Sequence, residues 1–116
     1  MPTFATFCNR LDDLISYIEQ HPEEWDQKEW CGTACCLAGH AYLCSKGRPP
    51  LTEDYERDVI TICNTAKKYL GLNSDEAAYL FRGWRNLDDF KHFSKNRRLL
   101  RKPLFYHQIY SIMGSC

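Results

Sequence analysis

Apolar side chains recur at intervals of three and four residues along this chain, a spacing typical of helices that bury one face. The first such stretch predicts a helix over residues 4–20, with Thr3 as its N-cap and His21-Pro22 at its end. Its apolar face comprises Phe7, Leu11, Leu14, Ile15 and Ile18. Because no stretch shows the alternation of a β-strand, we expect an all-α fold.

Residues 33–46 form the second predicted helix, with Thr33 as its N-cap and Gly47 directly after its end. Its small side chains let other helices approach closely, so we expect it to be central and buried. Gly39 inside this helix lowers the stability of the helix by about 1 kcal/mol relative to alanine. A tight helix crossing would explain that glycine, and a ligand pocket above it is the alternative.

Two more helices follow in the predicted order. Thr52 is the expected N-cap of the third helix and Gly71 its end, while Asn73 caps the fourth with Glu76 as the acid of a capping box. The apolar face of the third helix comprises Tyr55, Val59, Ile62, Cys63, Ala66, Tyr69 and Leu70. The side chains of the fourth that we expect to face inward are Ala77, Leu80, Phe81 and Trp84.

The pattern is less regular over residues 88–101, and Pro103 is expected to begin a last short helix over residues 103–113. The apolar positions of these two stretches are Phe90, Phe93, Leu100, Phe105, Ile109, Ile112 and Met113. We therefore expect one all-α domain over residues 1–116, with five or six helices packed around the second and third. Residues 91–102 and the terminal helix could be additions to it.

Composition narrows the class of protein. The chain has 116 residues, of which 44% are hydrophobic, and it contains no apolar run of the roughly 18 residues that a membrane helix needs. The start of the chain lacks the pattern of a signal peptide, so we expect a cytoplasmic protein that does not bind membranes. Seven cysteines, an odd number, then argue for reduced thiols rather than a disulfide framework.

Charge is distributed unevenly although the net charge is zero. Residues 1–60 carry 5 basic and 11 acidic side chains, and residues 61–116 carry 10 and 4, so the halves have charges of −6 and +6. Such an uneven charge distribution gives information about binding partners rather than about the fold.

Several short motifs occur in a fixed order between residues 12 and 90. They include Trp30-Cys31-Gly32-Thr33, Leu37-Ala38-Gly39-His40 and Leu70-Gly71-Leu72-Asn73-Ser74-Asp75-Glu76-Ala77. In these motifs the chain resembles a group of small helical proteins of phages and bacteria. The resemblance implies a shared helical fold and an origin in phages or mobile elements, and it implies no reaction.

A metal site is one candidate, because Cys36, His40 and Cys44 are spaced i, i+4, i+8 on one face of the second predicted helix. Cys36 and Cys44 would lie about 12 Å apart along the helix axis, too far for one zinc ion with bonds of roughly 2.0–2.3 Å. One i, i+4 pair could bind zinc only with ligands from Cys8, Cys31, Cys63 or His21. We favour buried thiols and expect no metal and no cofactor.

A nucleophilic cysteine is a second candidate. Cys35 and Cys36 fall in the first turn of the predicted helix, where the helix dipole lowers the pKa of a thiol. No local motif supplies the base that such a thiol would need. We expect no catalytic residue, but if the protein is an enzyme the candidates are Cys31, Cys35 and His40.

The basic segment, residues 91–102, is the third candidate. Our expected binding residues are Lys95, Arg97, Arg98, Arg101 and Lys102. Cations this close repel one another and gain at most about 0–1 kcal/mol each from surface pairing, so binding of an anionic partner would explain them. Phosphates and acidic protein surfaces are both suitable partners, and neighbouring aromatic rings could stack on bases. The alternative is a solvated helix face that balances the acidic half.

Three functions follow from these candidates. The first is a small non-catalytic binding or regulatory protein, such as a phage-type inhibitor of a host defence system, whose partner has an acidic surface. The second is a nucleic-acid-binding protein that uses residues 91–102. The third is a thiol-dependent or metal-dependent enzyme built on the helix at 33–46. The oligomeric state does not follow from the sequence.

Overall fold

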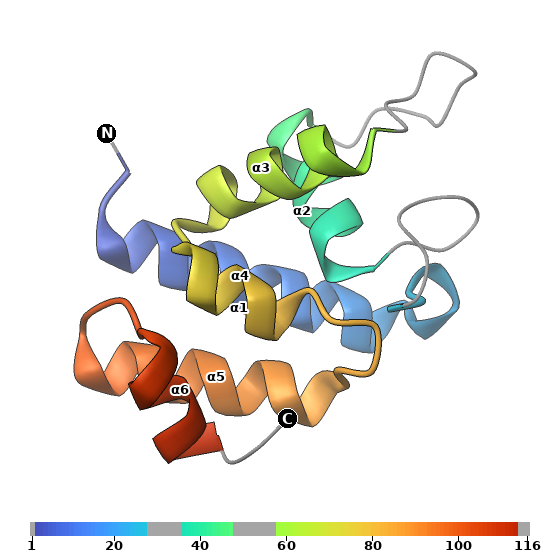
Figure 1. Cartoon of the computed structure of the whole chain (residues 1–116). Coiled ribbons are helices and arrows are strands. Elements are labelled where there is room, and N and C mark those ends of the chain that lie inside the picture. Colours follow the sequence, from blue (N-terminus) through green and yellow to red (C-terminus); the bar gives the residue numbers. More distant parts are fainter. Residues whose placement is uncertain (1, 28–35, 48–57, 114–116) are drawn as a thin grey trace.

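A computed structural model of the chain describes residues 2–27, 36–47 and 58–113 (Figure 1). These residues form six α-helices and a short 3-10 turn, and none of them forms a β-strand, which confirms the all-α fold. The elements in chain order are α1 (Phe4–Gln20), η1 (Pro22–Glu24), α2 (Leu37–Ser45), α3 (Val59–Leu70), α4 (Ser74–Leu80), α5 (Leu87–Leu100) and α6 (Tyr106–Met113). None of these helices is both long and apolar enough to span a membrane.

Helix α1 has the bounds that its apolar spacing predicts. The Thr3 hydroxyl oxygen accepts a hydrogen bond from the backbone N–H of Thr6 at 3.1 Å, which confirms Thr3 as the N-cap. The buried positions of α1 are Cys8, Leu11, Leu14, Ile15 and Ile18. One face of α1 therefore enters the core, and the opposite face remains in solvent.

Helix α2 is shorter than expected. Cys36 has extended backbone angles, with φ −73° and ψ 177°, so α2 begins at Leu37 and the predicted start at Thr33 is wrong. Thr33 itself lies outside the described residues. Cys36 is the N-cap, since its Sγ accepts a hydrogen bond from the backbone N–H of Gly39 at 3.3 Å. Gly47 adopts the expected left-handed conformation, with φ +77°.

Helix α3 also begins later than predicted, at Val59 rather than after Thr52, which lies outside the described residues. Asp58 has an extended backbone conformation, and its carboxylate accepts hydrogen bonds from the Ile60 N–H at 3.4 Å and the Thr61 hydroxyl at 2.7 Å. Asp58 therefore takes the capping role that we assigned to threonine. The end of α3 is as predicted, because Gly71 has φ +63°.

Helix α4 has the predicted capping box. Asn73 Oδ1 accepts from the Glu76 N–H at 2.8 Å, and Glu76 Oε1 accepts from the Asn73 N–H at 3.0 Å. The expectation that Trp84 faces inward is wrong, since its side chain is 60% exposed. Helix α4 ends at Leu80, so the helical spacing that would bury Trp84 does not continue that far.

The last two helices differ from expectation at their junction. Helix α5 covers most of the irregular segment, and α6 begins at Tyr106 rather than at Pro103. Leu104, between the two helices, is fully buried, whereas Leu100 and Phe105 are exposed instead of facing the core. Leu104 and the buried Ile109 bring α6 against the core, so residues 103–113 contribute to the single domain.

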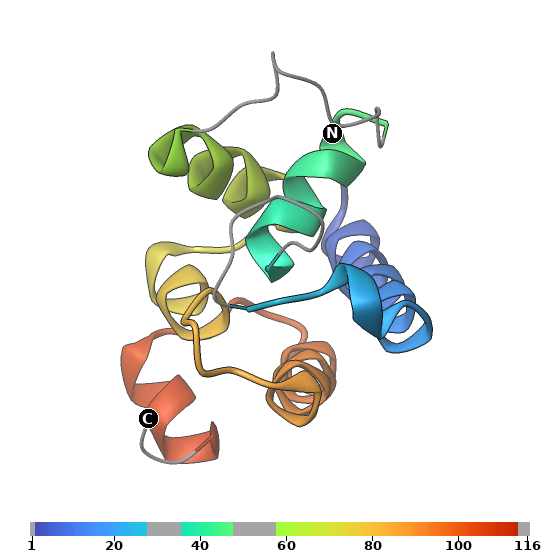
Figure 2. The same cartoon turned by 90° about the vertical axis from the view of Figure 1, so that its right-hand side faces the viewer.

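The helices pack in three tiers (Figures 1 and 2). Helices α2 and α3 form one side of the molecule, α5 and α6 form the opposite side, and α1 and α4 lie between them. Helix α1 contacts α2, α3 and α5, and α2 packs against α3 with most of its residues buried. The largest fully buried apolar side chains are Leu11, Leu14, Ile18, Leu37, Ile62, Leu70, Leu80, Phe90, Phe93, Leu104 and Ile109.

Candidate functional site

His40 is part of the packing between α2 and α1. Its ring is 1% exposed, and Nε2 lies 2.7 Å from the backbone oxygen of Glu24. A carbonyl oxygen only accepts hydrogen bonds, so Nε2 carries the proton and donates it. The ring also packs against that of Tyr17, with centroids 5.7 Å apart. These contacts give His40 a structural role. Cys31 and Cys35, the other two candidates for catalysis, lie outside the described residues.

The three residues of the possible zinc site do not all lie within α2. Cys36 precedes α2 in an extended conformation, whereas His40 and Cys44 are inside the helix. Over the part of the chain that the structure describes, no three His, Cys, Asp or Glu side chains come together as a metal-binding group. The cysteines in that part are Cys8, Cys36, Cys44 and Cys63.

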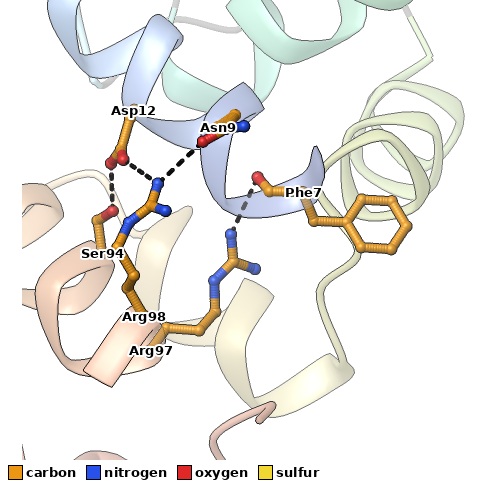
Figure 3. Close-up of polar contacts among 6 residues, drawn as sticks. All are labelled: Phe7, Asn9, Asp12, Ser94, Arg97 and Arg98. Atoms are coloured by element: carbon orange, nitrogen blue, oxygen red, sulfur yellow. Dashed lines mark hydrogen bonds and ion pairs between the residues drawn. The ribbon is translucent and has the colours of Figure 1, made fainter. Parts of the chain in front are cut away.

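Arg97 is not a surface cation. Its side chain is 1% exposed, and it donates a hydrogen bond to the backbone oxygen of Leu70 at 3.1 Å. It also donates to the backbone oxygen of Phe7 at 3.2 Å, as Figure 3 shows. The guanidinium carbon lies within 6 Å of two ring centroids, 5.6 Å from Phe4 and 5.7 Å from Phe93. Burial lowers the pKa of Arg97, and Cys8 and Glu76 nearby act in the opposite direction. The expectation that Arg97 lies on the binding surface is therefore wrong.

Arg98 forms an ion pair within the molecule. Its Nη2 donates to Asp12 Oδ2 and also to Asn9 Oδ1 at 3.2 Å, and the hydroxyl of Ser94 donates to the other oxygen of Asp12 (Figure 3). The hydrogen bond to Asp12 raises the pKa of Arg98. Both side chains of the pair remain about half exposed, so Arg98 is still accessible to a partner.

Lys95, Arg101 and Lys102 are exposed, and within the described residues their side chains form no hydrogen bond or ion pair. Arg101 also has a positive φ of 55°, the one such value outside glycine among the described residues. It ends α5 with its N–H bonded to the oxygen of Arg97 at 3.0 Å. A left-handed conformation costs a residue with a side chain about 1–2 kcal/mol. Of the five predicted binding residues, these three have a free cation.

A groove of about 760 Å³ lies between the beginning of α1 and the end of α5. We call it the α1–α5 groove. Its lining residues are Phe4, Ala5 and Cys8 on one side and Lys95, Arg98, Leu99 and Arg101 on the other. Cys8 is 2% exposed and lies at the floor, while Leu99 is 70% exposed at the rim. The groove thus combines an apolar lining with three cations, and its volume falls in the range of about 300–1,000 Å³ for ligand sites.

Sequence reasoning identified the cations of this groove and missed its apolar wall. Phe4, Ala5 and Cys8 are about ninety residues away along the chain, and no local pattern links them to α5. The burial of Arg97 did have a local signal. Phe90, Phe93 and Arg97 are spaced i, i+3, i+7, so a helix places Arg97 on the buried aromatic face.

A second groove, of about 360 Å³, is lined by residues of α1, α2 and α3. Arg10, one of its two cations, donates to the backbone oxygen of Tyr69 at 2.8 Å and stacks 4.4 Å above the ring of that residue. Since Arg10 is already engaged, the α1–α5 groove is the stronger candidate for binding an anion.

Comparisons of this chain with protein-family profiles, with curated proteins and with solved structures find no match. The function must therefore be argued from the residues and their arrangement.

Proposed function

We propose that this is a small non-catalytic binding protein that recognises an acidic surface of a partner protein through the α1–α5 groove. The observation that carries the proposal is the combination, in one open groove, of an apolar lining with the cations of Lys95, Arg98 and Arg101. Interfaces between proteins commonly join apolar contact with arginine in this way. The resemblance to small phage and bacterial proteins suggests a regulator, such as an inhibitor of a host defence system.

The composition of the groove favours binding over catalysis. Among its lining residues Cys8 and Lys95 carry the nucleophilic groups, and none of the lining residues is a histidine or a carboxylate that could act as a base for the thiol. His40, the candidate base of the enzyme hypothesis, is 1% exposed and does not line the groove. A thiol enzyme would need a base elsewhere, whereas a binding protein needs only the groove.

Nucleic acid is the second candidate partner, and the groove suits it less. Phosphate binding gains from many free cations. Arg97 is buried and Arg98 is already paired with Asp12, which leaves fewer cations for a phosphate backbone. The apolar side chains of the lining would also gain no favourable contact with a phosphate backbone. An acidic protein surface with apolar side chains would use both features of the groove.

Charge reversal in the groove tests the proposal. The double variant Lys95→Glu/Arg101→Glu should lose the partner, and Lys46→Glu/Lys68→Glu makes the same change of net charge at exposed lysines elsewhere. The wild-type protein and both variants would be immobilised and exposed to host lysate. Any lysate protein that the wild type and the control variant capture but the groove variant does not would then be purified. Its binding to each of the three proteins would be measured by titration at low and high salt.

The expected result is a purified acidic protein that binds the wild type and the control variant equally, and binds the groove variant at least about 10-fold more weakly. Its affinity should fall as the salt concentration rises. Identical capture by all three proteins would contradict the proposal. Loss of the captured material after nuclease treatment would favour the nucleic-acid alternative.

A further inference from the structure

We infer that the α1–α5 groove receives a single amphipathic helix of the partner, about two turns long, which inserts an apolar side chain between acidic ones. This inference rests on the proposed function and gives the partner segment a definite form. Its first support is the shape of the groove. Helices α1 and α5 lie side by side and antiparallel, with the start of α1 beside the end of α5 (Figure 1). A third helix can pack along such a pair by fitting its side chains between theirs.

The length of the segment follows from the spacing of the cations. From Lys95 to Arg101 the chain advances six residues, or about 9 Å along the axis of a helix at 1.5 Å per residue. Lys95, Arg98 and Arg101 are three residues apart, roughly one turn each. Carboxylates spaced three or four residues apart on a partner helix would have matching intervals. Each could accept a charge-assisted hydrogen bond from one cation.

The apolar lining has room for an anchoring side chain. Ala5 and Cys8 are small, and with Phe4 they form the α1 wall of the groove. Leu99 stands on the opposite side, 70% exposed. A leucine or phenylalanine of the partner, inserted between these walls, would cover Leu99 and the sulfur of Cys8. Anchors of this kind dominate the recognition of helices in grooves.

A helix suits this groove better than an extended peptide. Neither wall offers the edge of a β-sheet, because both belong to helices, and the backbone groups without helical partners there are those of the two terminal turns. An extended peptide would find few backbone partners there and would leave its own N–H and C=O groups unsatisfied in apolar surroundings. A helix satisfies these groups itself and brings only side chains to the groove.

A second copy of this chain is a weaker occupant. Helix α1 contains three acidic residues, and its exposed positions after the first turn are Asn9, Asp13, Ser16, Glu19 and Gln20. None of these five side chains is an apolar anchor, and Glu19 already pairs with Lys91. Helix α1 of a second copy therefore does not supply the acidic and apolar side chains that the groove fits.

Three fluorescent peptides test the inference against the full-length protein. The first is a designed helix of about 14 residues, roughly four turns, with leucines on one face and glutamates beside them. The second has the same composition in scrambled order, which keeps the charge and removes the helical spacing. The third replaces the glutamates of the first with glutamine. Binding would be followed by fluorescence anisotropy, and the bound peptide's helicity by circular dichroism.

We expect the first peptide to bind at least about 10-fold more tightly than either control and to gain helicity. Its binding should weaken in Lys95→Glu/Arg101→Glu but not in Lys46→Glu/Lys68→Glu. It should shift the backbone amide signals of Ala5, Cys8 and Leu99 in nuclear magnetic resonance spectra. These three residues place the peptide in the α1–α5 groove rather than on another basic surface.

Equal binding of the first and scrambled peptides, both lost in Lys95→Glu/Arg101→Glu, would overturn the helix while leaving the acidic partner in place. Absence of binding by the first peptide would also overturn the inference. Equal binding of every acidic peptide to the wild type and to Lys95→Glu/Arg101→Glu would contradict the proposed function itself. A single-stranded oligonucleotide that shifted the same three amides, where the first peptide did not, would replace the protein partner with nucleic acid.

Discussion

Arg97 connects three helices with one buried cation. It belongs to α5, and its guanidinium donates to Phe7 of α1 and to Leu70 of α3. Its Nε, by contrast, has no hydrogen-bond partner in the described structure, so the charge is not fully compensated by hydrogen bonds. Removal of Arg97 would destabilise the fold, because the buried backbone oxygen of Leu70 and the partly buried one of Phe7 would each lose a hydrogen bond from a charged donor.

We predict that Arg97→Met lowers the free energy of unfolding by about 3 kcal/mol or more, since two hydrogen bonds from a charged donor are lost. Arg97→Lys keeps the charge without the planar fork and should cost less, about 1–2 kcal/mol. Urea denaturation measures both. The folded fraction of Arg97→Lys should still bind the partner, because Arg97 does not line the groove. An unfolding free energy of Arg97→Met within about 0.5 kcal/mol of the wild type would contradict the buried role.

Glu76 is a second buried charge with two backbone partners. Its Oε1 accepts from the Asn73 N–H at 3.0 Å, and its Oε2 accepts from the Leu104 N–H at 3.1 Å. Burial is the largest cause acting on this carboxyl and raises its pKa from the ordinary value of 4.5, although both hydrogen bonds act to lower it. The folded protein therefore binds a proton at Glu76 more readily than the unfolded chain does.

This difference predicts a pH dependence of stability. Since the pKa of Glu76 is raised on folding, its contribution to stability is full below pH 4.5 and is lost as the pH rises through the pKa of the folded state. In Glu76→Gln that titration is absent, and one backbone N–H faces an amide NH₂, at a cost of about 1–3 kcal/mol.

The measurement is the difference in unfolding free energy between the wild type and Glu76→Gln, by urea denaturation at several values between about pH 7 and pH 4.5. The advantage of the wild type should grow as the pH falls. Other titrating groups are common to both proteins and cancel in the difference. A constant or shrinking advantage would show that the hydrogen bonds outweigh burial.

At the scale of the helices, two glycines with positive φ have different surroundings. Gly71 ends α3 with φ +63°, and a Cβ built there would lie 2.3 Å from Cδ2 of Phe7. Gly47 follows α2 with φ +77°, and a Cβ there would meet nothing within 4 Å. A substitution at Gly47 therefore measures the cost of the backbone conformation alone. A substitution at Gly71 adds the cost of a clash with Phe7.

We predict that Gly47→Ala lowers the free energy of unfolding by about 1–2 kcal/mol, the cost of a left-handed residue with a side chain. Gly71→Ala should lose that amount and about 1–3 kcal/mol more, because Phe7 must move within a packed interface. Thermal or urea denaturation of the two variants provides the comparison. Equal losses would mean that the Phe7 ring moves aside without cost.

The helix ends show which features follow from sequence. The Thr3 cap, the Asn73–Glu76 capping box and the Gly71 stop were predictable because each motif lies within a few neighbouring residues. The starts of α2 and α3 were not. Threonine is a common N-cap, and nothing local shows that Cys36 and Asp58 take this role instead.

The candidate site follows the same distinction between local and distant contacts. The cations at Lys95, Arg98 and Arg101 are visible as a basic run in the sequence. The burial of Arg97 involves hydrogen bonds to carbonyls 27 and 90 residues away in the sequence. The α1 wall of the groove likewise comes from the opposite end of the chain. Only the packing of α1 against α5 creates a site from these parts.

At the scale of the whole molecule, α6 packs against the core. From the sequence alone, this helix could have been an addition to the domain. Three hydrogen bonds hold its approach to α4: Glu76 and Asp75 accept from the N–H groups of Leu104 and Tyr106, and Asn73 Nδ2 donates to the oxygen of Leu104 at 3.0 Å. Leu104 and Ile109 are at most 1% exposed. These contacts make residues 103–113 part of the core.

We therefore predict that a chain ending at Lys102 loses at least about 4 kcal/mol of its unfolding free energy. Burial of Leu104 and Ile109 contributes about 1.5–3 kcal/mol each, and the hydrogen bond to Glu76 contributes about 1 kcal/mol. Against the 5–15 kcal/mol typical of a whole domain, this loss should leave the shortened chain partly unfolded at room temperature. Urea denaturation and the dispersion of amide signals would show it. The full-length variant Leu104→Ala isolates one contact and should lose about 2–5 kcal/mol. An unchanged denaturation midpoint for the shortened chain would mean that α6 is an addition to a domain complete without it.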